Sequence, residues 1–299
     1  MNLFNVQTLQ GRLINWAPLL QEAAPAVRSL LGMTSHLFQS SKSHRRKLVH
    51  KSHFSAVRII LAYLVWFDMQ TTSLGHKESF LGIDQHQVMT LCPAEIEKVS
   101  GCHAWVVSAI CDILDLSAWR TQAENQGRLS LFELVQRGNV IFNNIGINLN
   151  QIQDEFSVDL ASTWSQDSQQ VRGNSAITAI FSYAAITYLH VVISGPNPHL
   201  TEIKEAVSQA VKCLRDLAVD KSAANLTWPI CVVGCMAGGE DRVGLQECMS
   251  KLNGMEQKSH SFHNVIRVVR DCWKVRDEGR DCDWSVIINQ MTPDWEQVA

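Results

Sequence analysis

Charged residues are scarce in this chain, and neither sign dominates. Lys and Arg number 26 and Asp and Glu number 29 among 299 residues, so the formal net charge is -3. A surface that binds nucleic acid across a whole protein normally carries a basic excess, and this balance gives it no support. Only 18% of the residues are charged and 46% are hydrophobic, which is too apolar for a disordered chain and enough for a large core.

The start of the chain is not expected to be a secretory leader, and its most apolar run is not expected to span a membrane. The start, MNLFNVQTLQGRLINW, has no basic segment followed by an unbroken apolar stretch. The most apolar run, Ala56 to Phe67, contains Arg58, stops at Asp68 and is shorter than the roughly 18 residues that a membrane span needs. We therefore expect a soluble chain inside the cell, with no membrane partner. Its nine cysteines are expected to be reduced and mostly buried thiols.

Strand patterns and repeats are scarce as well. The stretch NVIFNNIGINLN (residues 139–150) is the best strand candidate, and it is weak. Elsewhere apolar residues recur at spacings of three and four, which predicts helices, most clearly over residues 102–114, 203–217 and 262–273. Thr201 is the expected N-cap of the second helix, and Gly279 is the expected C-terminal stop of the third.

The segment SAITAIFSYAAITYLHVVISGPNP (residues 175–198) is apolar on nearly all sides. This pattern predicts a central helix that other helices cover, ending at the breaker cluster Gly195-Pro196-Asn197-Pro198. The late tryptophans Trp273, Trp284 and Trp295 are interpreted as anchors that tie the tail to the core. No stretch is rich enough in Pro, Gly or Ser to be a convincing linker. The predicted fold is all-α: a single packed multi-helix domain, arranged as an irregular helical bundle.

The stretch TWPICVVGCMAGGEDRVG (Thr227 to Gly244) has the outline of a strand that runs into a phosphate loop. Gly234 and Gly239 have the spacing of such a loop, but Glu240 and Asp241 stand where it needs Lys and Ser or Thr. The dinucleotide-binding pattern needs a glycine at position 236, which is Met236. We therefore interpret the stretch as a buried segment that ends in a glycine-rich loop.

Other patterns of metal binding or catalysis are equally incomplete. Cys231 and Cys235 lie on an apolar run, and His260 and His263 follow far downstream, so a zinc site is not predicted. The pair Asp112 and Asp115 lies on the solvent face of its predicted helix and is a poor substitute for clustered magnesium ligands. His103 and His190 fall in predicted helices, where packing roles are common. We predict no catalytic, cofactor-binding or metal-binding residue.

One basic cluster, KSHRRKLVHKSH, runs from Lys42 to His53. It could be a nuclear-import signal or a contact for an anionic partner. It could also be a solvated loop that leads into a helix. The sequence leaves these alternatives open.

The second half of the chain resembles a known family. The text YLHVVISGPNPHLTEIKEAVSQAVKCLRDL, the segment NLTWPICVVGCMAGGEDRVG and the tail RDCWKVRDEGRDCDWSVIINQM together resemble the fungal-specific transcription factor domain, the regulatory region of many zinc-cluster regulators. SGCHAWVVSAICDILDL looks like the Gly-Cys helix of that family. The resemblance runs from about Phe54 to the end and implies a helical regulatory domain (54–299) after an N-terminal helical and basic segment (1–53).

The resemblance also implies a function and a location. It implies a non-enzymatic transcription regulator in the nucleus that controls a specific gene set, such as a biosynthetic or developmental pathway. The implied partners are proteins of the transcription machinery, a DNA-binding partner, or a second copy of the chain. The resemblance also implies that Trp228 and Pro229 begin a buried helix. Proline is tolerated in the first turn, because the N–H that it lacks would have no partner there.

One departure from the family stands out. Its DNA-reading module has cysteine triplets, whereas the first cysteine here is Cys92 and no such triplet follows. We therefore expect no direct DNA reading from this chain, which would be a fragment, a mis-started gene product or a stand-alone regulator. The alternative is a helical enzyme or small-ligand-binding protein of a biosynthetic pathway, which should have a deep pocket with converging polar groups.

Overall fold

The protein is helical throughout the part that the computed structural model describes, which is residues 17–40, 49–75, 78–159, 166–217, 225–255 and 260–291. These residues form twelve helices and no strand, so the predicted all-α fold is confirmed. The helices are α2 (Ala17–Ser40), α3 (Val49–Leu74), α4 (Gln85–Leu91), α5 (Pro93–Ser100), α6 (Ala104–Asn125), α7 (Leu131–Asp159), α8 (Gln166–Ser194), α9 (Thr201–Asp216), α10 (Thr227–Met236), α11 (Gly239–Met255), α12 (His260–Asp277) and α13 (Trp284–Met291).

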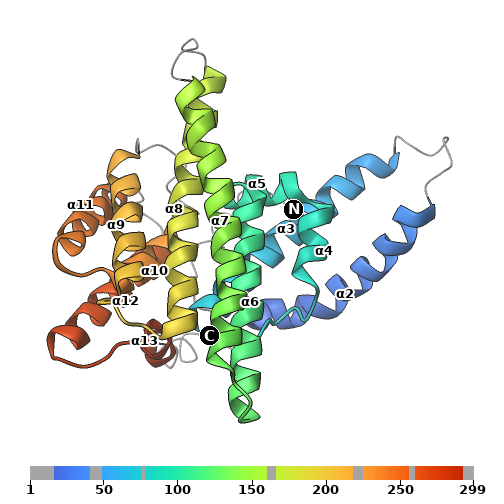
Figure 1. The fold of residues 1–299 in the computed structure, drawn as a ribbon. Coiled ribbons are helices and arrows are strands. Elements are labelled where there is room, and N and C mark those ends of the chain that lie inside the picture. Colours follow the sequence, from blue (N-terminus) through green and yellow to red (C-terminus); the bar gives the residue numbers. More distant parts are fainter. Residues whose placement is uncertain are drawn as a thin grey trace.

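Helix α8 is the centre of the domain. It packs against α6, α7, α9 and α10 (Figure 1). Its side chains Ile180, Phe181, Ala184 and Leu189 are fully buried, and the helix ends at Ser194 before the Gly195 to Pro198 breaker, as predicted. The stretch Asn174–Ser194 is long and apolar enough to cross a membrane, but 67% of its most apolar window is buried inside the domain, as in a core helix.

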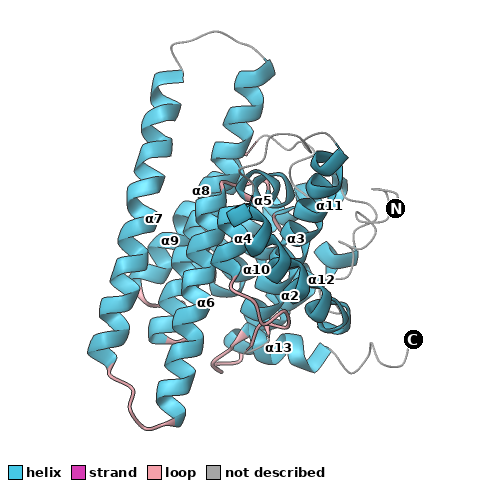
Figure 2. Ribbon diagram, turned by 90° about the vertical axis from the view of Figure 1, so that its right-hand side faces the viewer, coloured by secondary structure: helices cyan, strands magenta, loops and turns pink. Residues whose placement is uncertain are grey.

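Helices α7 and α8 form a long hairpin that rises beyond the other helices (Figures 1 and 2). Residues 139–150, the weak strand candidate, lie inside α7 and form no strand. Ile141, Ile145, Leu149 and Ile152 recur at spacings of four and three and are all buried, which selects a helix. In this helix Ile145 is buried, whereas Ile147, two residues later, is exposed to solvent.

The C-terminal helices follow the predicted patterns closely. In α9 the buried side chains are Ile203, Ala206, Val207, Ala210, Val211 and Leu214, the apolar face read from the sequence. Thr201 is the first residue of α9, while Leu200 occupies the N-cap position and no side chain caps the helix, which corrects the expected cap. Helix α12 ends at Asp277, and Gly279 follows with a φ of 77°, a left-handed conformation that favours glycine.

Aromatic side chains join the two halves of the domain. The Trp228 ring of α10 stacks on Phe181 of α8 at a centroid distance of 5.8 Å, and Trp66 of α3 lies 5.5 Å from the same Phe181. The indole N–H of Trp228 donates to Ser73 Oγ at 2.7 Å. Trp273 and Trp284 are buried, as expected of anchors, whereas Trp295 lies outside the described residues.

The N-terminal helix contributes to the same core. Leu20, Ala24 and Val27 of α2 are buried in it. Helix α3 runs across the predicted boundary between residues 53 and 54. The division into 1–53 and 54–299 stays a prediction.

Candidate functional site

The stretch from Thr227 to Gly244 is a core helix followed by a short turn and a second helix. Every residue of α10 is buried, and the helix begins at Thr227 with Pro229 in its first turn, which confirms the buried-helix interpretation. Gly234 lies where α10 approaches α12, and its carbonyl accepts a hydrogen bond of 2.8 Å from the Trp273 indole. Glu240 and Asp241 lie in the first turn of α11. Gly234 therefore serves helix packing.

Four cysteine side chains gather where α10, α12 and the segment before α13 meet. Cys231, Cys235, Cys272 and Cys282 are all buried, and thiol hydrogen bonds link Cys235 to Cys231 and Cys272, and Cys272 to Cys282. Burial raises the pKa of Cys235, and it raises the pKa of Cys282 to about 12. Hydrogen bonding from Cys235, helped by Cys282 and the Arg276 charge, lowers the pKa of Cys272 against the effect of burial.

Arg276 holds these elements together. Its guanidinium donates to the carbonyl of Cys235 and, at 3.1 Å, to the carbonyl of Cys282. From the sequence, Cys231 and Cys235 were noted as a close pair, but Cys272 and Cys282 were missed. Helices α10 and α12 meet only in the folded chain, so their spacing gave no sign of the cluster. Among the described residues no group of three or more His, Cys, Asp or Glu is arranged to hold a metal ion.

The paired aspartates of α6 meet a histidine that the sequence did not single out. Nε2 of His86, in α4, lies 3.3 Å from Asp112 Oδ1 and 3.5 Å from Asp115 Oδ2. Both carboxylates are well exposed, with side-chain exposures of 44% and 77%, as the solvent-face reading predicted. The pKa of the Asp112 carboxyl is raised, because the effect of partial burial exceeds the opposite effect of the nearby His86. The contact ties α4 to α6 on the surface.

The two histidines that the sequence placed in helices, His103 and His190, both contact other helices of the domain. His103 lies one residue before α6, as its N-cap, and its backbone N–H donates to Thr178 Oγ1 at 3.1 Å. It therefore stands at the edge of the predicted helix instead of inside it. His190 is in α8, half-buried, with its ring 5.9 Å from that of Phe142.

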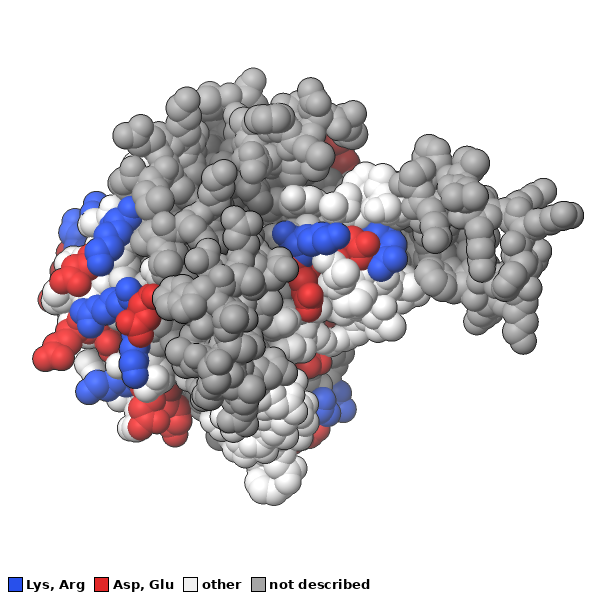
Figure 3. Space-filling model, turned by 90° about the horizontal axis from the view of Figure 1, so that it is seen from above, with Lys and Arg blue, Asp and Glu red and all other residues white. Residues whose placement is uncertain are grey.

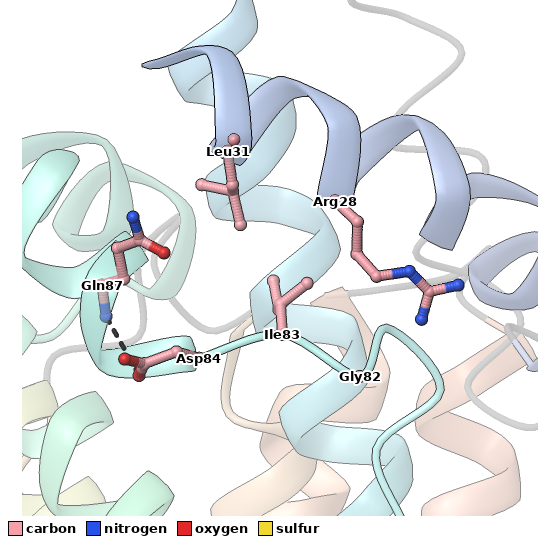
Figure 4. A pocket seen from close by; sticks show the side chains of 7 residues that line it. Arg28, Leu31, Gly82, Ile83, Asp84 and Gln87 are labelled. Atoms are coloured by element: carbon pink, nitrogen blue, oxygen red, sulfur yellow. Dashed lines mark hydrogen bonds between the residues drawn. The ribbon is translucent and has the colours of Figure 1, made fainter. Parts of the chain in front are cut away.

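A shallow hollow of about 220 Å³ lies between α2 and the segment that leads into α4 (Figure 4). Its polar side chains already have structural partners: Arg28 donates to the Leu81 carbonyl at 3.2 Å, and Asp84 accepts from the Gln87 N–H at 3.3 Å as the N-cap of α4. Ligand pockets usually hold about 300 to 1,000 Å³ and several free polar groups. This hollow does not match that description.

Exposed apolar side chains gather on α7. Its large exposed side chains are Leu131 (68%), Phe132 (73%), Val135 (43%), Val140 (62%), Phe142 (40%) and Ile147 (59%). We call these six, together with the exposed Asn139, the α7 outer face. Helix α7 packs on α6 and α8 and runs along the edge of the domain (Figure 2). Apolar residues scattered singly on a surface are ordinary, whereas a patch marks an interaction site.

A family model matches the chain over almost its entire length. The model is that of the fungal specific transcription factor domain, and it covers residues 1–298. The chain belongs to this family. The match begins at residue 1, whereas the resemblance read from the sequence begins at about Phe54. No solved structure matches the chain.

Curated relatives of this fungal transcription factor domain are similar along most of the chain. The trichothecene biosynthesis transcription regulator TRI10 of Trichoderma arundinaceum is 25% identical over 290 residues, which are 95% of this chain and 62% of the relative. The ustiloxin B cluster transcription factor ustR of Aspergillus flavus is 26% identical over 91% of this chain and 50% of the relative. The transcription factor dibT of Pestalotiopsis microspora is 26% identical over 86% and 44%. The chain thus spans about half the length of these relatives.

Proposed function

We propose that this chain is the regulatory domain of a nuclear transcription regulator that controls a set of biosynthetic genes. The observation that carries the proposal is the family match over residues 1–298. The names of the relatives support the pathway class, since they include a trichothecene biosynthesis regulator and a ustiloxin B cluster factor.

The domain acts through protein contacts and performs no catalysis. The α7 outer face, with its cluster of exposed apolar side chains, supports a contact role. The DNA is read by a partner or by sequence outside these 299 residues. This division of labour agrees with the net charge of -3 and with the absence of cysteine triplets in the printed sequence.

Gene deletion in the source organism tests the function. Loss of the chain should change the transcript levels of a biosynthetic gene set several-fold while most other transcripts stay constant, as measured by RNA sequencing. Restoring the wild-type gene should restore the transcripts. Transcript levels that do not respond to deletion under producing conditions would contradict the proposal.

Nuclear entry is assigned to the basic cluster from Lys42 to His53, whose side chains lie outside the described residues. Replacing Arg45, Arg46 and Lys47 with Ala removes three positive charges and should reduce the nuclear fraction of a fluorescent fusion several-fold. A matched control replaces Arg267, Arg270 and Lys274, three exposed cations of α12, with Ala. Unchanged localisation of the triple variant would leave the cluster with no import role.

The alternative of a helical enzyme or ligand-binding protein predicts a deep pocket with converging polar groups. The hollow beside α2 is small, and its polar atoms are engaged in capping and backbone hydrogen bonds. No observation on the described residues favours this alternative, so we propose the regulatory function alone.

A further inference from the structure

We propose that Cys272 and Cys282 form a site of reversible oxidation, where hydrogen peroxide joins the two thiols into a disulfide that ties the segment before α13 to α12. The disulfide is measured on the purified chain and gene control in the cell, so either proposal can fail without the other.

The charged surface of the domain singles out no ligand. Figure 3 shows Lys and Arg side by side with Asp and Glu on the described surface, most densely on the side of α9 and α11. Arg215 of α9, for example, lies 3.9 Å from Glu247 of α11. Because the two signs are interleaved there, this surface favours neither an anionic nor a cationic partner. The four-cysteine cluster, by contrast, gathers reactive groups of one kind in one place.

Cys272 lies at the centre of the thiol cluster. Its sulfur is hydrogen-bonded to the thiols of Cys235 and Cys282. Arg276, one turn further along α12, supports the same placement, because its guanidinium binds the backbone carbonyls of both Cys235 and Cys282. All nine cysteines are free thiols here, so the cluster is in its reduced form. Two sulfurs that the fold already holds in contact meet the first requirement of a disulfide.

The surroundings of Cys272 favour its thiolate, which is the form of cysteine that reacts with oxidants. Hydrogen bonds from the thiols of Cys235 and Cys282, together with the charge of Arg276, lower the pKa of Cys272 although its side chain is buried. Burial raises the pKa of Cys282 to about 12, so this thiol keeps its proton. The pair therefore combines one sulfur that is oxidised first and one that resolves the product.

The position of Cys282 makes it the partner of Cys272 in place of Cys235. Cys235 belongs to α10, every residue of which is buried. Cys282 follows five consecutive exposed residues, Asp277 to Asp281, and the φ of Gly279 among them is 77°. A surface segment of this kind opens more easily than a core helix and can adjust its backbone to disulfide geometry. Peroxide therefore reaches the cluster from the Cys282 side.

The reaction consumes one molecule of hydrogen peroxide per disulfide. The Cys272 thiolate attacks one peroxide oxygen, the O–O bond breaks, and the released hydroxide takes up the proton that Cys272 lost. The sulfur of Cys282 then attacks the sulfenic sulfur of Cys272. The S–S bond forms as the S–O bond breaks, and the hydroxyl leaves as water with the Cys282 proton. Two thiols and one peroxide thus give one disulfide and two water molecules, and a dithiol reverses the oxidation.

The disulfide acts on a segment that reaches the core of the domain. Trp284, two residues after Cys282, is buried, and its ring lies 6.1 Å from that of Tyr188 in α8. Helix α13 also packs on α12. Oxidation therefore joins α12 covalently to the start of α13, where the surface loop meets the aromatic core, and gives the domain a response to peroxide.

The test is peptide mapping of the purified 299-residue chain after exposure to sub-millimolar hydrogen peroxide and blocking of the remaining thiols. Trypsin separates the cysteines, because residues 271–274 carry Cys272, residues 281–299 carry Cys282, and residues 222–242 carry both Cys231 and Cys235. The map should contain peptides 271–274 and 281–299 as one linked pair that lacks two hydrogen atoms. Dithiothreitol should restore the two separate peptides.

Cys213 is the internal control, because it is the one cysteine of the nine that is not buried. If exposure alone set the reactivity, Cys213 would be oxidised first. Cys272 and Cys282 should instead lose their thiols at least about tenfold faster, because a favoured thiolate in contact with a second sulfur outweighs exposure. Cys282→Ser should abolish the linked pair. Cys235→Ser, the matched change on the other side of Cys272, should keep it, since Ser still donates a hydrogen bond.

Cys272 and Cys282 that remain thiols overturn the proposal, whether or not Cys213 is oxidised. A wild-type map in which peptide 271–274 is linked to peptide 222–242 also overturns it, since a cysteine of α10 is then the partner of Cys272. These two outcomes are read from the wild-type chain, so they decide the matter even where a variant fails to fold.

Discussion

At the scale of single residues, the hydrogen bonds of one buried carboxylate organise a segment of the fold. Asp68 is fully buried where the apolar run of α3 ends, and its carboxylate accepts hydrogen bonds from Ser79 Oγ at 2.6 Å, the Phe80 N–H at 2.8 Å and Gln85 Nε2 at 2.8 Å. The carboxylate thus organises the segment that leads into α4. From the sequence, Asp68 was only the end of an apolar run.

Replacing Asp68 with Ala should lower the free energy of unfolding by about 3 kcal/mol, because several buried donors lose their acceptor together. Chemical denaturation measures this loss. Asp84→Ala is the control, since Asp84 is exposed and caps α4 with a single hydrogen bond, and its loss should cost about 1 kcal/mol. Equal costs for the two variants would show that the Asp68 network contributes little.

His190 predicts a pH dependence of stability. Burial lowers its pKa below the ordinary 6.5, against Glu202, which raises it. Between the lowered folded pKa and 6.5 the unfolded chain binds more protons, so the contribution of His190 to stability is present above 6.5 and is lost as the pH falls through this window. The free energy of unfolding should therefore fall more steeply from pH 7 to about pH 5 in the wild type than in His190→Gln. The exposed His199→Gln should keep the wild-type slope.

At the scale of helices, packing decides where glycine is required. Helices α10 and α12 approach so closely at Gly234 that a Cβ there would lie 2.7 Å from Val269 Cγ2 and 3.0 Å from Leu245 Cδ2. The sequence showed this glycine as part of an incomplete phosphate loop. The structure shows it as the point where the buried helix α10 touches α12.

Gly234→Ala should cost about 2 kcal/mol of unfolding free energy, because the added methyl forces branched side chains of α11 and α12 to move. Gly32→Ala in α2 makes the same change in open space and should stabilise the protein by about 0.5 to 1 kcal/mol through helix propensity. Thermal unfolding of the two variants should therefore shift in opposite directions. A neutral Gly234→Ala variant would indicate that the helices separate at little cost.

At the scale of the whole molecule, one aromatic cluster connects distant parts of the chain. Trp66, Phe181, Tyr188, Trp228 and Trp284 come from α3, α8, α10 and α13 and lie within about 6 Å of one another in successive pairs. Helix α8 carries two of them and runs through the centre (Figure 1). Such a shared core favours cooperative unfolding.

Trp228→Ala should therefore destabilise the entire domain by about 4 kcal/mol, since it removes a large buried ring and leaves Ser73 without its donor. Denaturation followed by circular dichroism and by tryptophan fluorescence should give coincident midpoints in the wild type and in the variant. Trp119 of α6 is only partly buried, so Trp119→Ala should cause a smaller loss. Two separated transitions would mean that the helices fold as independent units.

The helical fold, the central position of α8 and the apolar face of α9 could all be predicted from the sequence, because helical periodicity is a local property of each segment. The sequence also determined the family, through the residues around Leu189 to Ala237. Only the tertiary structure showed the four-cysteine cluster, the contact of His86 with Asp112 and Asp115, and the role of Gly234, since these bring together residues far apart in the chain. The α7 outer face belongs with them: periodicity identifies apolar positions, but which of them the core covers depends on where neighbouring helices pack.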